Sequence, residues 1–277
     1  MTFEPLSTFW TGSAFRLSAQ SGWNQTEEDW RRLVRVSPGG VKVWIDRSEV
    51  RAAFSVAAYG TKLAWLGMVL VEETYRGQGL GKIVFQSCLD AAKALGVEAL
   101  GLDATHLGEP IYRRYGFGDV HAVTRWGGTP HTDQPVGAGS AIRSGLNDSI
   151  LELDFRIAGV DRSRLLRDLA DSDAFCHSLA EGGVVRGYVI ARPGRTAFHL
   201  GPLVAETGEQ MRDLLRAALA DLKGAPVICD ALSAGSETVL DALGLKPLRH
   251  LRRMAWPGLG ECFRHESLRL GAGFEWG

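Results

Sequence analysis

The sequence has few cysteines and no grouping of metal-binding side chains. Its four cysteines include no Cys-x-x-Cys pair, and its seven histidines show no ligand spacing. Structural zinc sites place cysteines and histidines at short intervals, and disulfide frameworks are typical of small, cysteine-rich secreted domains. We therefore expect no metal site, and reduced cysteines in the core at Cys88, Cys176, Cys229 and Cys262.

Long apolar runs and an excess of positive charge are also missing. No apolar run approaches the ~20 residues of a membrane-spanning helix, and residues 1–5 lack the order of a signal peptide. Lysine and arginine total 31 against 32 acidic residues, with no basic tract that could follow a nucleic acid backbone. The 277 residues, 45% of them hydrophobic, predict one or two globular domains in the cytoplasm. No nucleic acid or membrane partner is expected.

The most informative segment is a glycine-rich turn between a predicted strand and a predicted helix. Leu66–Val71 is an apolar run that predicts a buried strand, and the apolar spacing from Leu80 onward predicts a helix. Gly77, Gly79 and Gly81 lie at this junction. Free N–H groups at a helix N-terminus attract anions, and glycine lets an anion approach the backbone. We expect this turn to bind phosphate.

The spacing of the glycines discriminates among phosphate-bearing ligands. A Walker A loop needs four residues before its Gly-Lys-Ser/Thr, whereas three separate Gly77 from Gly81, and Ile83 follows Lys82. A dinucleotide fingerprint places its third glycine one residue later, although Asp103 stands near the position of its ribose-binding acid. A P-loop is therefore excluded, and a nucleotide-linked oxidoreductase stays an alternative.

The pattern Arg-x-x-Gly-x-Gly, filled by Arg76, Gly79 and Gly81, resembles the coenzyme A pyrophosphate loop of the GNAT superfamily of N-acetyltransferases. The resemblance implies acetyl-CoA as the cofactor. It implies that the pantetheine arm pairs with the backbone of β-strand residues, and that the turn takes the pyrophosphate. The cofactor-binding residues so assigned are Val69, Leu70, Val71, Arg76, Gly77, Gln78, Gly79, Leu80 and Gly81.

A second motif follows one helix and one strand later, as it does in that superfamily. Tyr112, three residues and then Gly116-Phe117 end a short helix that begins near Pro110. This ending resembles the GNAT motif in which the tyrosine protonates the departing thiolate of coenzyme A. A core aromatic residue on an ordinary capped helix is the alternative interpretation of Tyr112.

The resemblance implies a small-molecule amine as the acceptor, attacked directly in a ternary complex. Because an amine is mostly protonated near neutral pH, a group must remove its proton before attack. The candidates near the ends of the two central strands are Glu72, Glu73, Asp103 and His106. For the acceptor wall we propose Trp23, Asn24 and Trp126.

An internal repeat divides the chain. Residues 66–74 recur as residues 200–207, and Asp103-Ala104 recurs as Asp230-Ala231. Between the repeats, residues 127–140 hold four glycines and two prolines, a composition typical of a linker.

The second copy lacks the features of the cofactor site. Acidic Glu209 follows its strand where the first half has the glycine turn, and Leu240 stands where Tyr112 stands. We therefore expect an α/β fold of two tandem GNAT-like domains, each a twisted mixed β-sheet flanked by helices. Residues 1–126 form the catalytic domain with the coenzyme A site, 127–140 the linker, and 141–277 a degenerate GNAT-like domain.

Three segments are similar to a tandem-domain group whose second half is called the YitH/HolE-type acetyltransferase domain. They are Gly22–Thr26, Leu102–Thr105 and Thr124–Trp126. The alternative function is a catalytically weak acyl-CoA-binding or interaction module on a GNAT scaffold, since the degenerate half shows a fold without its site. The presence of Tyr112 in the first half favours the enzyme.

Overall fold

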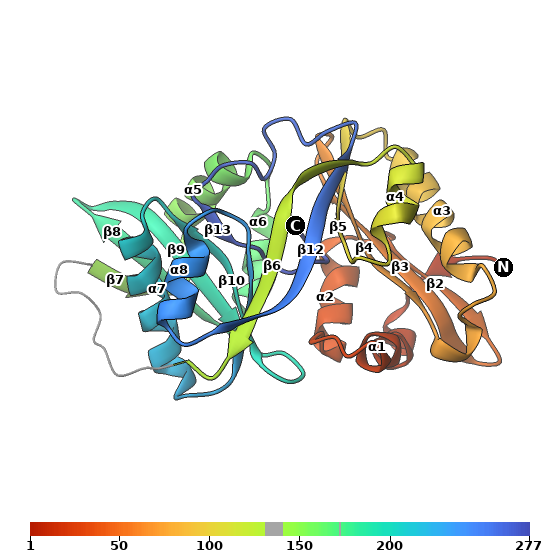
Figure 1. The fold of residues 1–277 in the computed structure, drawn as a ribbon, viewed down its shortest axis with the longest axis horizontal. Coiled ribbons are helices and arrows are strands. Elements are labelled where there is room, and N and C mark those ends of the chain that lie inside the picture. Colours follow the sequence, from red (N-terminus) through yellow and green to blue (C-terminus); the bar gives the residue numbers. More distant parts are fainter. Residues whose placement is uncertain (131–140, 172) are drawn as a thin grey trace.

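Two α/β halves share one β-sheet of 13 strands in the computed structural model of the chain, which describes residues 1–130, 141–171 and 173–277 (Figure 1). Residues 131–140 of the predicted linker lie outside the described residues. Within the described residues, no helix combines the length and apolar character that crossing a bilayer requires.

The first half contains the strand, helix and turn order expected around the glycine turn. Its elements are β1 (Glu4–Pro5), η1 (Thr8–Trp10), α1 (Thr11–Gln20), α2 (Glu27–Val36), β2 (Val41–Asp46), β3 (Glu49–Tyr59), β4 (Leu63–Val71), η2 (Glu73–Tyr75), α3 (Leu80–Lys93), β5 (Ala99–Ala104), α4 (Glu109–Arg114) and β6 (Gly118–Gly128). The predicted capping box at the start of α2 is confirmed: the Asp29 N–H donates to Thr26 Oγ1 (3.1 Å), and the Thr26 N–H donates to Asp29 Oδ2 (2.7 Å).

The second half repeats this order without the glycine turn. Its elements are β7 (Ala141–Ser144), α5 (Asp148–Ala158), α6 (Ser163–Leu169), β8 (Phe175–Glu181), β9 (Val184–Arg192), β10 (Phe198–Ala205), α7 (Gly208–Leu222), β11 (Val227–Ala231), α8 (Ser236–Ala242), β12 (Lys246–Trp256) and β13 (Leu268–Leu270). The repeated sequence segments therefore occupy matching elements, β4 with β10 and β5 with β11.

The two halves exchange strands at the centre of the sheet, where the order is β4-β5-β12-β6-β11. Strand β12 from the second half pairs with β5, and β6 from the first half pairs with β11. Figure 1 shows β6 and β12 running next to each other between the two groups of helices. Each half is thus completed by a strand of the other.

A buried ion pair holds each exchanged strand. Arg253 on β12 donates from Nε and Nη2 to the Asp103 carboxylate on β5 at 2.9 and 2.8 Å. Arg125 on β6 donates in the same way to the Asp230 carboxylate on β11 at 2.7 and 2.8 Å. Asp103 and Asp230 are equivalent positions of the repeat, so the recurrence of Asp-Ala marks the two places where a strand from the other half arrives.

The central parallel strands of each half separate after a short pairing. Strand β4 pairs with β5 only over Leu63–Trp65, and β10 pairs with β11 only over residues 198–199. In the second half β13 fills the gap, where Leu270 lies opposite both Leu203 and Ala231. In the first half, no strand within the described ranges enters the corresponding gap.

The segment that follows β13 passes from the second half into the first. Tyr59 Oη on β3 donates to the Trp276 carbonyl at 2.6 Å, and Trp65 Nε1 on β4 donates to the Phe274 carbonyl at 2.9 Å. The Trp276 side chain is fully buried in the core that contains residues of both halves. The C-terminal segment therefore joins the halves in addition to the exchanged strands.

We predict that neither half folds alone. Residues 1–130 without β12 expose the edge of β5 and leave Asp103 unpaired, and residues 141–277 without β6 leave Asp230 unpaired. Circular dichroism and gel filtration should find each half aggregated or unfolded, and a soluble 1:1 complex when both are co-expressed. A folded monomer of residues 1–130 would contradict the exchange.

Candidate active site

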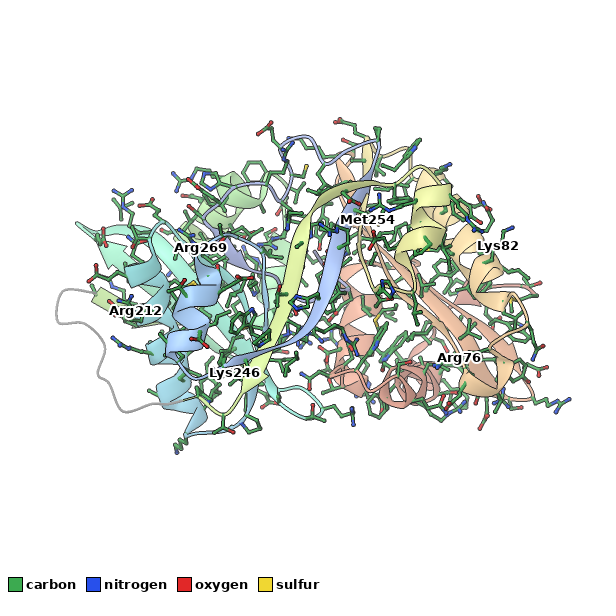
Figure 2. The ribbon with its side chains drawn as sticks, in the orientation of Figure 1. Arg76, Lys82, Arg212, Lys246, Met254 and Arg269 are labelled. Carbon is green, nitrogen blue, oxygen red and sulfur yellow. The ribbon has the colours of Figure 1, made fainter. Side chains whose placement is uncertain are left out.

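The glycine turn presents backbone N–H groups that the protein itself does not use. Gly77 and Gly79 both have φ of 77°, in the left-handed region that favours glycine. Gly79 is the N-cap of α3 without a side-chain cap, and none of the described residues accepts a hydrogen bond from the N–H groups of residues 77–79. Arg76 and Lys82 flank the turn in the sequence, and Figure 2 shows both at the same end of the molecule, on the right of the view. N–H groups and cations in this arrangement can bind an anion.

The equivalent helix of the second half is closed by its own side chains. The Gln210 N–H donates to Thr207 Oγ1 (3.2 Å), and Gln210 Oε1 accepts from the Glu206 N–H (2.9 Å). Leu240, at the position equivalent to Tyr112, is fully buried. The amides that the first half leaves open are therefore occupied in the second.

Two hollows meet beside the glycine turn. Val69, Phe85, Thr105 and Tyr112 line both of them. The outer hollow is also lined by Val71, Arg76, Gly77, Gly79, Leu80, Gly81, Lys82, Leu107, Gly108 and Ile111. The inner hollow is also lined by Trp23, Gln25, Leu66, Gly67, Met68, Leu102, Asp103, Arg125, Arg249, Leu251, Phe274 and Glu275. The inner hollow thus takes its walls from both halves, because β12 and the C-terminal segment supply the last four residues.

Strand β4 is irregular where the hollows meet. Met68 has φ of 50°, and the register of β4 with β3 shifts between Ala53 and Ser55. A β-bulge of this kind re-aims backbone groups next to functional sites.

Tyr112 lies at the junction of the two hollows as a neutral phenol. Its ring contacts Phe85 at 4.6 Å between centroids, and a β-carbon at Gly108 would lie 2.8 Å from the ring. Burial raises the pKa of Tyr112 to about 12. The hydroxyl therefore keeps its proton at neutral pH and can donate it to a group in either hollow.

The structure brings most of the predicted cofactor residues to the outer hollow. Leu70 is buried and Gln78 is exposed, and neither lines either hollow. Of the residues predicted for the acceptor wall, Trp23 lines the inner hollow and the other two do not.

Asn24 and Trp126 serve other contacts. Asn24 Oδ1 accepts from the Thr196 N–H at 2.9 Å, and its Nδ2 donates to the Ala197 carbonyl at 2.9 Å, so it holds the loop between β9 and β10. Trp126 is buried in the core of the second half, because β6 carries it across to β11.

The acids near the strand ends are engaged or exposed. Glu72 pairs with Arg16 and Arg51, and these guanidinium groups lower the pKa of its carboxyl against the opposing effect of burial. Asp103 is held by the bidentate pair with Arg253. Glu73 and His106 are exposed, and neither lines the inner hollow.

Glu275 is an acid of the inner hollow that the sequence did not reveal. It is buried, and β4 approaches it so closely that a β-carbon at Gly67 would lie 3.0 Å from the Glu275 Cα. Gln25 Nε2 donates to Glu275 Oε2 at 2.8 Å, and Arg192 Nη2 lies 3.3 Å from Oε1. Burial raises the pKa of the Glu275 carboxyl, with Arg192 opposing the rise. The one available sequence signal was an acid between two aromatic residues, Phe274 and Trp276.

Both halves match known acetyltransferase families. Residues 9–117 match the acetyltransferase (GNAT) family, and residues 150–259 match an acetyltransferase (GNAT) domain. The chain is 24% identical over 214 residues to a Bacillus subtilis (strain 168) protein described as the uncharacterized N-acetyltransferase YitH. That match covers 76% of this chain and 74% of the relative.

Solved structures share the fold over most or all of the chain. A candidate acetyltransferase from Pyrococcus horikoshii superposes with a TM-score of 0.83 at 17% identity, covering 100% of this chain and 95% of that one. A tandem GNAT protein from the clavulanic acid biosynthesis pathway superposes with a TM-score of 0.64 at 15% identity, covering 92% and 97% of the two chains. At these identities the likeness shows the fold.

We predict that Tyr112 remains protonated well into alkaline solution. A pKa of about 12 means that it contributes no phenolate signal up to pH 10. The difference between the ultraviolet pH titrations of the wild type and Tyr112→Phe should therefore be flat to pH 10 and rise near pH 12. A difference that titrates near the ordinary tyrosine pKa would place the hydroxyl in water.

Proposed function

Since this chain belongs to the GNAT superfamily of N-acetyltransferases and holds two GNAT domains in tandem, we propose that its first half transfers an acetyl group from acetyl-CoA to a small-molecule amine. The observation that carries the proposal is the position of Tyr112, between a hollow at the glycine turn and a hollow closed by both halves. A donor and an acceptor bound in these two hollows would meet beside its hydroxyl.

The outer hollow suits the diphosphate of coenzyme A. A β-carbon at Gly77, Gly79 or Gly81 would meet nothing within 4 Å, so the space above the turn is open. Gly81 lies inside α3 without a positive φ, so the fold itself does not require glycine there. We infer that glycine is present at position 81 because a ligand approaches the backbone closely there. Arg76 and Lys82 supply positive charge.

The gap between β4 and β5 suits the pantetheine arm. Beyond Trp65 the β4 edge that faces β5 has no partner strand within the described residues. In the second half the matching gap holds β13, an extended segment of the chain itself. We propose that the amide-bearing arm pairs with Val69, Leu70 and Val71 as β13 pairs with β10.

Glu275 is our proposed proton acceptor in place of the four acids considered from the sequence. It lies against Gly67, next to the bulge at Met68. Burial raises the pKa of its carboxyl, so Glu275 is a stronger base than a solvated carboxylate. Gln25 lines the same hollow and orients Glu275 through the 2.8 Å hydrogen bond.

The proposed reaction needs two proton transfers by the protein. Acetyl-CoA supplies an activated thioester. The Glu275 carboxylate removes a proton from the ammonium group, and the freed nitrogen forms the new bond to the acetyl carbon as the carbon–sulfur bond breaks. Tyr112 donates its proton to the departing sulfur and recovers one from the acetylated nitrogen, so the proton on Glu275 is the one released to solvent.

Substitution of Gly81 tests the cofactor site. Gly81→Glu adds an acid to the first turn of α3, where the helix dipole tolerates it and open space accommodates it, so the protein should stay folded. The carboxylate should abolish the thermal stabilisation by acetyl-CoA, because it repels the diphosphate. The uncharged control Gly81→Gln should keep more of the stabilisation. If acetyl-CoA stabilised Gly81→Glu as strongly as the wild type, the cofactor would have to bind elsewhere.

Substitution of Glu275 tests the proton acceptor. Glu275→Gln should lower turnover by about 10²- to 10⁴-fold. Because a carboxyl must be deprotonated to act, wild-type turnover should fall as the pH drops through its raised pKa, and the variant should lose this acidic limb. Tyr112→Phe is the control that lowers turnover but keeps the limb. An unchanged profile in Glu275→Gln would reduce Glu275 to a structural residue.

A further inference from the structure

The charged side chains of the inner hollow are paired, with one exception. Glu275 lies beside Arg192, Asp103 is bound by Arg253, and Arg125 is bound by Asp230. The remaining charged residue that lines the hollow is Arg249, on β12. Within the described part of the chain, no carboxylate lies within ion-pair distance of its guanidinium group, and the side chain is exposed.

Arg249 lies directly opposite another arginine. In the pairing of β12 with β6, its register partner is Arg125. Like charges at directly opposed positions of an antiparallel pair destabilise a sheet. Asp230 neutralises one of the two guanidinium groups through the Nε and Nη2 atoms of Arg125. The pair therefore retains one net positive charge at the wall of the hollow.

An unused hydrogen-bond acceptor lines the same hollow. Gln25 is 7% exposed, and its Nε2 is committed to Glu275, which fixes the orientation of the amide. Its Oε1 is buried without a hydrogen-bond partner among the described residues. A buried acceptor without a donor is costly, so a hydrogen bond from a ligand N–H group to this atom would be favourable.

Apart from Thr105 and Tyr112, most of the remaining wall of the hollow is apolar. Leu66, Met68, Phe85, Leu102, Leu251 and Phe274 supply it. A ligand that matches this hollow has an apolar body, an N–H donor for Gln25 and an anionic group for Arg249.

We propose that the acceptor is an amine that also carries a carboxylate on an apolar body, as an apolar α-amino acid does. The carboxylate binds Arg249 beside Arg125, and the amine binds Gln25 Oε1 within reach of Glu275. One net positive charge matches a carboxylate better than a doubly charged phosphate. This proposal rests on the proposed function, because it names the acceptor of that same site.

Matched pairs of acceptors test the proposal in the wild-type protein. Thiol release from acetyl-CoA is measured with L-phenylalanine against phenethylamine, L-tryptophan against tryptamine, and L-leucine against isoamylamine. We expect a kcat/KM about ten- to a hundredfold higher for the carboxylated member, the effect of one charge-assisted contact. Equal or better turnover of the decarboxylated members would overturn the proposal.

Variants of β12 assign the preference to Arg249. Arg249→Ala should remove the preference by raising KM for the amino acid alone, and Arg249→Lys should restore part of it. The matched control is Arg252→Ala, on the same strand and outside the hollow, where Arg252 lies 4.0 Å from Asp119. A preference that survives Arg249→Ala would overturn the assignment.

Acetyl-CoA stabilisation, measured in the same samples, separates this proposal from the proposed function. If acetyl-CoA stabilises the protein but no member of any pair is acetylated, the acceptor proposal is wrong while the cofactor site stands. If acetyl-CoA gives no stabilisation, the proposed function itself fails, and the acceptor proposal with it.

Discussion

The reciprocal aspartate–arginine pairs of the two exchanged strands hold the molecule together. Asp103 with Arg253, and Asp230 with Arg125, are buried, and each pair joins a strand of one half to a strand of the other. Removing one partner of such a pair typically costs about 3–5 kcal/mol, because an unpaired charge stays buried. The same two strands carry Arg249, Leu251 and Arg125 to the inner hollow, so the exchange that stabilises the sheet also builds a wall of the site.

The two copies of the repeat differ in the features on which the proposed cofactor site depends. The first keeps a glycine turn with free amides, an open gap between β4 and β5, and Tyr112. The second closes the start of α7 with Gln210, has Leu240 in place of the tyrosine, and fills its gap with β13. The segment that follows β13 continues into the first half and lies beside β4, with Glu275 at the inner hollow. The segment that closes the gap of the second half thus leads directly to the residue that lines the hollow of the first.

The parts of the site that are local in sequence were predictable. The strand, turn and helix around Gly77–Gly81, the capping box at Thr26 and the short helix bearing Tyr112 each have a signal within about ten residues. The placement of Glu275 and Arg249 depends on pairings between strands more than a hundred residues apart, which leave no periodic pattern. Trp126 shows the same limit, because its strand crosses into the other half and buries it there.

We propose that the chain is one catalytic unit with a single cofactor site. Calorimetric titration of the intact protein with acetyl-CoA tests this claim most directly, because it counts sites without needing the acceptor. We expect one molecule bound per chain, since β13 and the capped start of α7 occupy the second position. Two molecules bound per chain would contradict this proposal, because they would require β13 to leave the gap between β10 and β11.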